Sequence, residues 1–288
     1  ESKLLLVNAL KNKNEIVTMT GDGVNDSPAL KASHIGVAMG ERGTDVARES
    51  ADLVVLNDDF SSIVNAIRLG RKIFDNLKKA FAYLISVHVP IAGISVLPVI
   101  FSLPKIIFPV HVVFLEMVID PACSVVFESE DEEAGLMNRP PKNPDEPLLG
   151  KKSIVISVLQ GLISMSAVIG VYFFSLNSQN PESESRSLTF VTLVLSNIFL
   201  IFTNRHWSLS VYGSFRKKNP AIKWVAGFTF IFLFLSISVP FLQEIFKFSF
   251  PSPEHLIIAT LAAVGSVAWF EILKLFSQRN GFDLLRDK

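Results

Sequence analysis

Two aspartates four residues apart, Asp22 and Asp26, carry the first chemistry that this sequence suggests. They lie in the segment 20–28, which reads TGDGVNDSP and connects a short apolar run to a predicted helix. At the carboxyl end of a parallel strand, both carboxylates can converge on a hard cation such as Mg²⁺. Gly21 and Gly23 let the backbone approach a phosphate closely. The segment therefore predicts a site for phosphate and metal, and the alternative is a plain surface turn.

A second pair of acids lies inside a long apolar stretch. Glu116 and Asp120 are also four apart, so a helix would place both carboxylates on one face, next to Pro121. Proline frees carbonyl oxygens of the preceding turn, and carboxylates with carbonyls suit a dehydrated cation. His88, in the first span, and Asn197, in the fourth, are two further polar side chains that stand out within the apolar stretches. The alternatives are that Glu116 lies near an interface, that Asp120 bonds a neighbouring helix, and that Asn197 only joins helices.

Composition indicates an integral membrane protein. Of 288 residues, 49% are hydrophobic and 24 are Phe, and the mean hydropathy is +0.41. The 27 Lys and Arg balance the 27 Asp and Glu, so no net charge points to a nucleic-acid partner. The single cysteine, Cys123, excludes an internal disulfide.

Residues 1–72 alternate short apolar runs with helical patterns, which is typical of βαβ units in a mostly parallel sheet. Strands are expected at 16–19, 35–38 and 53–55, and helices at 3–11, 27–31, 44–49 and 60–72. Such a short region gives a small core. We expect it to be part of a domain whose other strands precede Glu1.

Residues 73–288 contain six apolar stretches near the ~20 residues that a spanning helix needs. They lie at 78–101, 106–127, 153–176, 187–204, 221–242 and 255–276. We therefore expect a transmembrane domain of six helices, followed by a tail.

Lys and Arg in the loops predict the orientation of these spans. The loops on one side and the C-terminal end are basic, with Arg139, Lys142, Lys151, Lys152, Arg205, Arg216, Lys217, Lys218, Lys223, Lys274, Arg279, Arg286 and Lys288. The opposite loops hold only Lys105, Arg186 and Lys247. We expect residues 1–72 and the C-terminus to be cytoplasmic, and the membrane to be the plasma (inner) membrane.

The segment 20–28 resembles the TGDGVNDxP signature of the P-type ion-pumping ATPases, whose phosphorylation domain has the haloacid-dehalogenase-like fold. The segment 115–121, LEMVIDP, and the number of spans extend the resemblance along the chain. It implies a mixed fold, a partial α/β Rossmann-type phosphorylation domain followed by an all-α transmembrane domain. Six spans and one cysteine differ from the heavy-metal branch, which leaves the calcium-like, sodium/potassium-like and proton-pumping branches.

The resemblance also implies ATP hydrolysis through an aspartyl-phosphate. Asp22 would hold Mg²⁺, Asn25 and Asp26 would orient metal and phosphate, and Lys3 would neutralise phosphoryl charge. Thr20, Gly21 and Gly23 would lie against the phosphate. The phosphorylated aspartate of the DKTGT motif and a nucleotide-binding domain do not occur in this sequence. We expect this chain to be the C-terminal portion of a longer polypeptide that binds ATP and Mg²⁺, and to be inactive alone.

The transported ion is expected to be Ca²⁺, or Mn²⁺. Asp120 matches the membrane aspartate that calcium-type pumps use as a ligand, and Glu116 stands where they often carry Asn. Two ligands of the first span appear here as His88 and Ile91, which favours one ion per cycle. One alternative is a pump for H⁺, Na⁺ or K⁺ with Glu116, Asp120 and His88 as proton carriers. Another is a non-catalytic membrane subunit with a vestigial phosphatase-like domain.

Overall fold

The structure, a computed structural model, describes residues 2–133, 135–142, 146–206 and 217–280, the last four of these by their backbone alone. The chain forms two compact units, Glu1–Arg71 and Lys72–Lys288. Each unit is described by itself. Of the basic residues that predict the orientation, Arg216, Arg286 and Lys288 and the side chain of Arg279 lie outside the described part.

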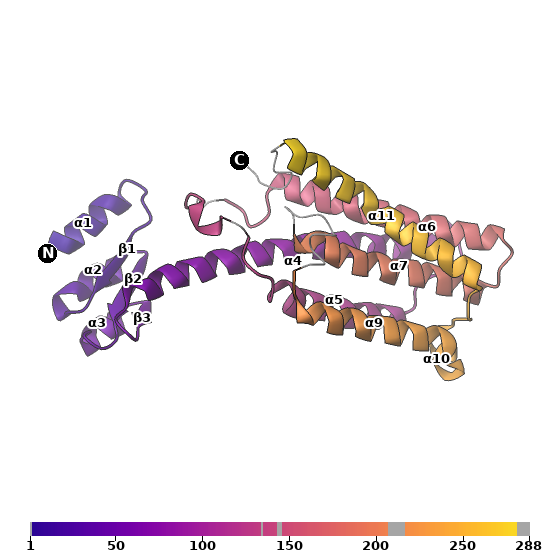
Figure 1. Ribbon diagram of the computed structural model, residues 1–288, viewed down its shortest axis with the longest axis horizontal. Helices are drawn as coiled ribbons and strands as arrows, with labels where there is room; N and C mark the ends of the chain where they lie inside the picture. The colour runs from indigo at the N-terminus through magenta and orange to yellow at the C-terminus, as the bar shows by residue number, and fades with distance from the viewer. Residues whose placement is uncertain (1, 134, 143–145, 207–216, 281–288) are drawn as a thin grey trace. The chain divides into compact units, whose positions relative to one another are not determined.

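The first unit is built on a small parallel sheet, β1 (Thr18–Gly21), β2 (Ile35–Met39) and β3 (Leu53–Val55), in the order β1-β2-β3. Thr18 pairs with Ile35, and Val37 pairs with Leu53. Helices α2 (Ser27–Ala32) and α3 (Asp45–Ser50) connect the strands, and α1 (Ser2–Lys11) packs beside α2 (Figure 1). The parallel sheet confirms the predicted α/β fold, with the segment 20–28 beginning at the carboxyl end of β1.

The strand predicted at 16–19 lies two residues further along the chain. Val17 does not take part in the regular pairing of β1 with β2. Its carbonyl oxygen instead accepts hydrogen bonds from the backbone N–H groups of both His34 and Ile35. Its own N–H donates to Nδ1 of His34 at 3.1 Å. The prediction followed the apolar residues, but Ile16 is exposed and regular pairing starts at Thr18.

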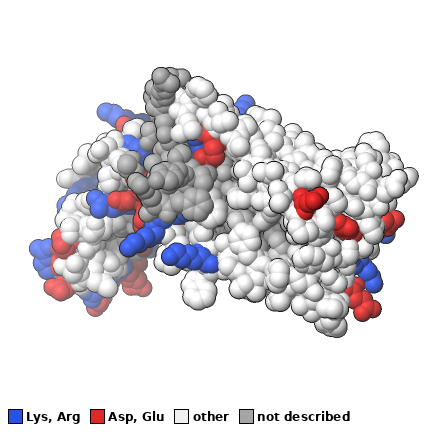
Figure 2. Space-filling view, turned by 45° about the vertical axis from the view of Figure 1, so that its right-hand side comes forward, with Lys and Arg blue, Asp and Glu red and all other residues white. Residues whose placement is uncertain are grey.

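The second unit contains six helices that are long and apolar enough to cross a membrane, counted over the described residues. They are α4 (Phe60–Ile100), α5 (Pro109–Pro121) continued by η2 (Ala122–Phe127), α6 (Lys151–Asn177), α7 (Glu182–Arg205), α9 (Pro220–Ser238) and α11 (Pro253–Asn280), and α4 begins within the residue range of the first unit. Helix α7 is the most buried of the spans and packs against α6 and α11 (Figure 1). Figure 2 shows a broad face with few charged side chains, as a lipid-facing surface requires.

Several boundaries differ from the expected ones; the fourth span, for example, begins at Glu182 instead of residue 187. The helix predicted at 60–72 and the first span form one helix, α4. The second span begins at Pro109 instead of residue 106 and becomes π-helical after Pro121. The fifth span ends at Ser238 instead of residue 242. The cause is Pro240, which disfavours a helical conformation of the residue before it, and Val239 is extended. A separate helix, α10 (Pro240–Phe246), follows.

Candidate functional site

Lys3 and Asp26 are joined although they are far apart in the sequence. Nζ of Lys3, on α1, lies 2.6 Å from Oδ1 of Asp26, at the end of the 3-10 turn η1 (Val24–Asp26). The lysine side chain is 60% exposed and the aspartate side chain 8%. The hydrogen bond from Lys3 lowers the pKa of Asp26 below its ordinary value and raises the pKa of Lys3. Both groups are therefore charged at neutral pH.

The loop that carries these residues is fastened at several points. Oδ2 of Asp26 accepts from the backbone N–H of Asp22 at 3.3 Å. The backbone N–H of Thr44 donates to the carbonyl oxygen of Asp22 at 2.8 Å. A Cβ at Gly21 would lie 2.5 Å from Cβ of Asp26, so only glycine allows this approach. The close turn brings Asp26 back over the end of β1.

The two aspartates differ in how they could meet a metal ion. Both oxygens of Asp26 already accept hydrogen bonds, whereas the carboxylate of Asp22 is exposed, as is Asn25. Among the described residues, no group of three or more His, Cys, Asp or Glu side chains is placed to hold a metal. An exposed carboxylate with water and phosphate oxygens is nevertheless what Mg²⁺ uses in phosphate sites. The geometry suits Asp22 as the metal ligand and Asp26 as the residue that holds Lys3.

Glu116 and Asp120 lie together on the wall of a groove in the second unit. The groove has a volume of about 810 Å³ and runs between α5 and α9. Its other wall is largely apolar and contains Trp224, Val225 and Phe228. The two acids thus share one helix face, and this face is not enclosed by the described residues.

His88 and Asn197 lie in different surroundings. Nε2 of His88, on α4, is 3.8 Å from Oε1 of Glu116, so the first and second spans bring these side chains together. Asn197 is fully buried in α7, and neither of its amide atoms has a hydrogen-bond partner among the described residues. No hydrogen bond among the described residues joins Asn197 to the other three polar positions.

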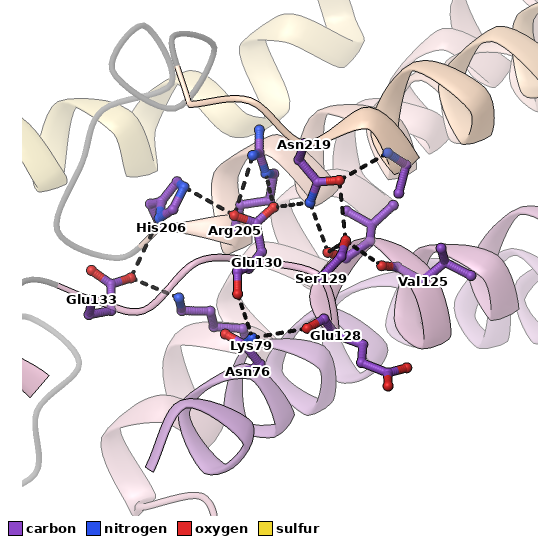
Figure 3. A network of polar contacts seen from close by, with 12 residues as sticks. Asn76, Lys79, Val125, Glu128, Ser129, Glu130, Glu133, Arg205, His206 and Asn219 are labelled. Carbon is purple, nitrogen blue, oxygen red and sulfur yellow. Dashed lines mark hydrogen bonds and ion pairs between the residues drawn. The ribbon is translucent and has the colours of Figure 1, made fainter. Parts of the chain in front are cut away.

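Sequence reasoning missed a buried polar network in the second unit, centred on Glu130 (Figure 3). Arg205, the last residue of α7, forms an ion pair with Oε1 of Glu130, and both side chains are 2% exposed. Nε2 of His206 lies 3.2 Å from Oε2 of Glu130, and Nδ2 of Asn219, the N-cap of α9, donates to Oε1 at 2.5 Å. The Glu130 side chain thus ties the chain that follows η2 to α7 and α9.

Helix α4 joins the same network. Nδ2 of Asn76 donates to the carbonyl oxygen of Glu130 at 3.0 Å, and Nζ of Lys79 lies 2.7 Å from Oε1 of Glu133 (Figure 3). Burial alone would raise the pKa of Glu130, but His206, Arg205 and Asn219 outweigh burial and lower it to about 2. A run of acids after an apolar span looks like a solvated loop, so only long-range contacts identify this one as buried.

Comparisons with known proteins agree with this architecture. Residues 104–276 match the family described as cation transporting ATPase, C-terminus, and residues 3–67 match the haloacid dehalogenase-like hydrolases. The calcium-transporting ATPase 1 of Schizosaccharomyces pombe is 30% identical over 291 residues, which cover 100% of this chain and 32% of that protein.

Two bacterial relatives are similar to a comparable degree. The calcium-transporting ATPase of Bacillus subtilis is 33% identical over 252 residues, 85% of this chain and 28% of that protein. The cation-transporting ATPase pma1 of Synechocystis is 34% identical over 220 residues, 76% of this chain and 24% of that protein. The chain therefore spans about a quarter to a third of the length of these relatives.

Proposed function

This chain belongs to the cation transporting ATPases, and on that premise we propose that it forms part of a pump that uses ATP to move a cation across a membrane. It is an integral, multi-pass membrane protein, since six apolar helices accompany membrane ATPase relatives. The observation that carries the proposal is the contact between Lys3 and Asp26 at 2.6 Å, next to the exposed Asp22. A cation beside an acidic loop at a strand end is what phosphoryl transfer requires.

In this proposal the first unit is part of the phosphorylation domain, residues 1–72, and the transmembrane domain is 73–288. Asp22 would hold Mg²⁺, which neutralises phosphoryl charge when bound. Asp26 holds the ammonium of Lys3 near the loop, and Asn25 would help orient the phosphate, with Thr20, Gly21 and Gly23 beneath it. The phosphorylated aspartate and the ATP site would belong to the length of the relatives that this chain does not match.

For the transported ion we propose a site that includes Glu116, Asp120 and His88, with Asn197 as a further candidate. Two relatives are named calcium-transporting ATPases, and carboxylates are ligands that Ca²⁺ and Mn²⁺ accept. H⁺, Na⁺ and K⁺ are the alternatives. The plasma membrane, with residues 1–72 and the C-terminus in the cytosol, is the proposed location.

The test of the catalytic loop is Asp22→Asn in the full-length pump. Phosphoenzyme formation from ATP and Mg²⁺ should fall about a hundredfold or more, because the amide is a poor ligand for Mg²⁺. Asp45→Asn is the matched control, since Asp45 is 94% exposed on α3 and should leave the rate unchanged. Normal phosphorylation of the Asp22→Asn variant would show that Asp22 is not the Mg²⁺ ligand. Absence of a phosphoenzyme in the wild type would instead favour a non-catalytic membrane subunit.

A further inference from the structure

His88 has a fixed ring orientation within the apolar part of α4. Its Nδ1 atom lies 2.8 Å from the carbonyl oxygen of Leu84. Because a carbonyl oxygen only accepts, Nδ1 carries the proton of the neutral ring. Nε2 then presents a lone pair, and this is the atom that lies 3.8 Å from Oε1 of Glu116.

The separation of these two atoms suits a shared ion better than a hydrogen bond. At 3.8 Å the pair is beyond hydrogen-bond range. Metal–nitrogen and metal–oxygen bonds of about 2.0–2.2 Å allow two ligand atoms up to roughly 4 Å apart. Histidine ligands also commonly donate their other N–H to a carbonyl, as His88 does to Leu84. Asp120 lies one turn from Glu116 on the groove wall, but among the described residues it does not converge with His88 and Glu116 as a third side-chain ligand.

His111, a buried histidine of this unit, shows what a purely structural ring looks like here. His111 is fully buried, with Nδ1 accepting from the backbone N–H of Phe108 and Nε2 bonded to the carbonyl oxygen of Phe246. His88, by contrast, is 49% exposed, and its carboxylate neighbour Glu116 is 42% exposed. A polar pair left on an apolar span surface is costly unless it binds something.

We propose that His88 supplies a nitrogen ligand that makes the transported-ion site prefer a first-row transition-metal dication that binds imidazole well, with Zn²⁺ as the probe, over Ca²⁺. This inference rests on the proposed pump function. Ca²⁺ binds about six to eight oxygen ligands, whereas imidazole nitrogen suits transition metals. Since no three acidic, His or Cys side chains converge among the described residues, the remaining ligands are carbonyl oxygens, water or groups elsewhere in the pump.

The experiment measures phosphorylation from ATP in the full-length pump at buffered free Ca²⁺, Mn²⁺ and Zn²⁺. In the wild type, half-maximal activation should need roughly tenfold less Zn²⁺ than Ca²⁺, with Mn²⁺, which also favours oxygen ligands, lying between them. His88→Asn replaces the nitrogen ligand by an oxygen and should shift this ratio at least about tenfold toward Ca²⁺. His255→Asn is the matched control, because His255 also lies beside a carboxylate, 3.0 Å from Glu184, and should leave the ratio unchanged.

A second measurement does not depend on the folding of any variant. Pulsed electron paramagnetic resonance of the Mn²⁺-loaded wild type should show coupling to an imidazole nitrogen, and His88→Asn or His88→Gln should lose it. The inference would be overturned if the wild type lacked that coupling, or if wild type and His88→Asn had the same ion preference. Either result would leave the proposed pump function standing. Phosphorylation that no ion activates would overturn the proposed function itself, and the inference with it.

Discussion

Asp26 is held by donors from two parts of the chain, and both stabilise its ionised form. The hydrogen bond from Lys3 and the backbone N–H of Asp22 lower its pKa below 3.8. The contribution of Asp26 to the stability of the folded state is therefore present above about pH 4 and is lost as pH falls through the lowered pKa. The pKa of Lys3 is raised above 10.5, so the lysine contribution is lost only as pH rises beyond that value. The pair persists over the whole physiological range.

At the residue scale, Lys3→Ala should slow phosphoenzyme formation in the full-length pump about a hundredfold, because a cation near the phosphoryl oxygens is removed. Lys11→Ala is the comparison, since Lys11 lies on the same helix but donates to the carbonyl oxygen of Ala32 at 2.7 Å. Rapid-quench measurements would give both rates. Equal rates for the two variants would mean that Lys3 only supports the fold of the loop.

These residues also show where sequence reasoning succeeds and where it stops. The strand-loop-helix order around 20–28 and the shared helix face of Glu116 and Asp120 were predictable, because both follow from neighbours in the chain. The convergence of Asp22 and Asp26 on one metal ion stays a prediction. The contact of His88 with Glu116 joins two helices, and its distance depends on packing that no local pattern encodes. The interior place of Glu130 was missed for the same reason.

At the element scale, Glu130 stabilises the ends of several helices at once. It meets the last residue of α7 and the N-cap of α9, and its backbone accepts from Asn76 on α4. Asn219 also donates to the carbonyl oxygen of Val126 within η2, at 3.0 Å. Because η2 continues α5 and α9 forms the facing wall, this contact joins both walls of the groove that Glu116 and Asp120 line.

Glu130→Gln should therefore lower the free energy of unfolding by about 3–5 kcal/mol, since it removes the carboxylate charge that forms a buried ion pair with Arg205. Glu128→Gln is the control, because Glu128 is exposed and enters the network only through its backbone. Thermal unfolding of detergent-solubilised protein would compare them. Similar melting temperatures for the two variants would mean that the ion pair adds no net stability.

The lowered pKa of Glu130 predicts that the thermal stability of the protein depends on pH. This pKa is lowered from 4.5 to about 2, so the stabilisation is complete above about pH 4.5 and is lost as pH falls toward 2. The difference in melting temperature between wild type and Glu130→Gln should shrink across that interval. A difference that stays constant would indicate that the loss in the variant comes from packing rather than charge.

The boundaries of the helices were predicted less well than their number. Six apolar stretches identified the six spans because length and hydropathy are local properties. Val239 is extended before Pro240, so the fifth helix ends early. Pro240, within the apolar run, indicates this early helix end in the sequence. No residue pattern indicates that the helical turns after Pro121 are π-helical.

At the scale of the whole molecule, the side of the membrane with few basic residues was expected to hold Lys105, Arg186 and Lys247. These three residues lie together at one end of the second unit. Nε of Arg186 donates to the carbonyl oxygen of Lys105 at 3.2 Å, and its Nη1 donates to that of Lys247 at 2.7 Å. The three residues therefore lie at the same end of the helices. Because cytoplasmic loops carry the excess of Lys and Arg, we expect this end to face the outside.

Single cysteines in a cysteine-free background of the full-length pump, which includes Cys123→Ala, would test that orientation. Lys105→Cys should react with a membrane-impermeant maleimide on intact cells, and Lys151→Cys only after lysis, since both side chains are exposed at loop or helix ends. The two positions serve as each other's control for thiol reactivity. The reverse pattern would invert the orientation, and labelling of neither site before lysis would place the pump in an internal membrane.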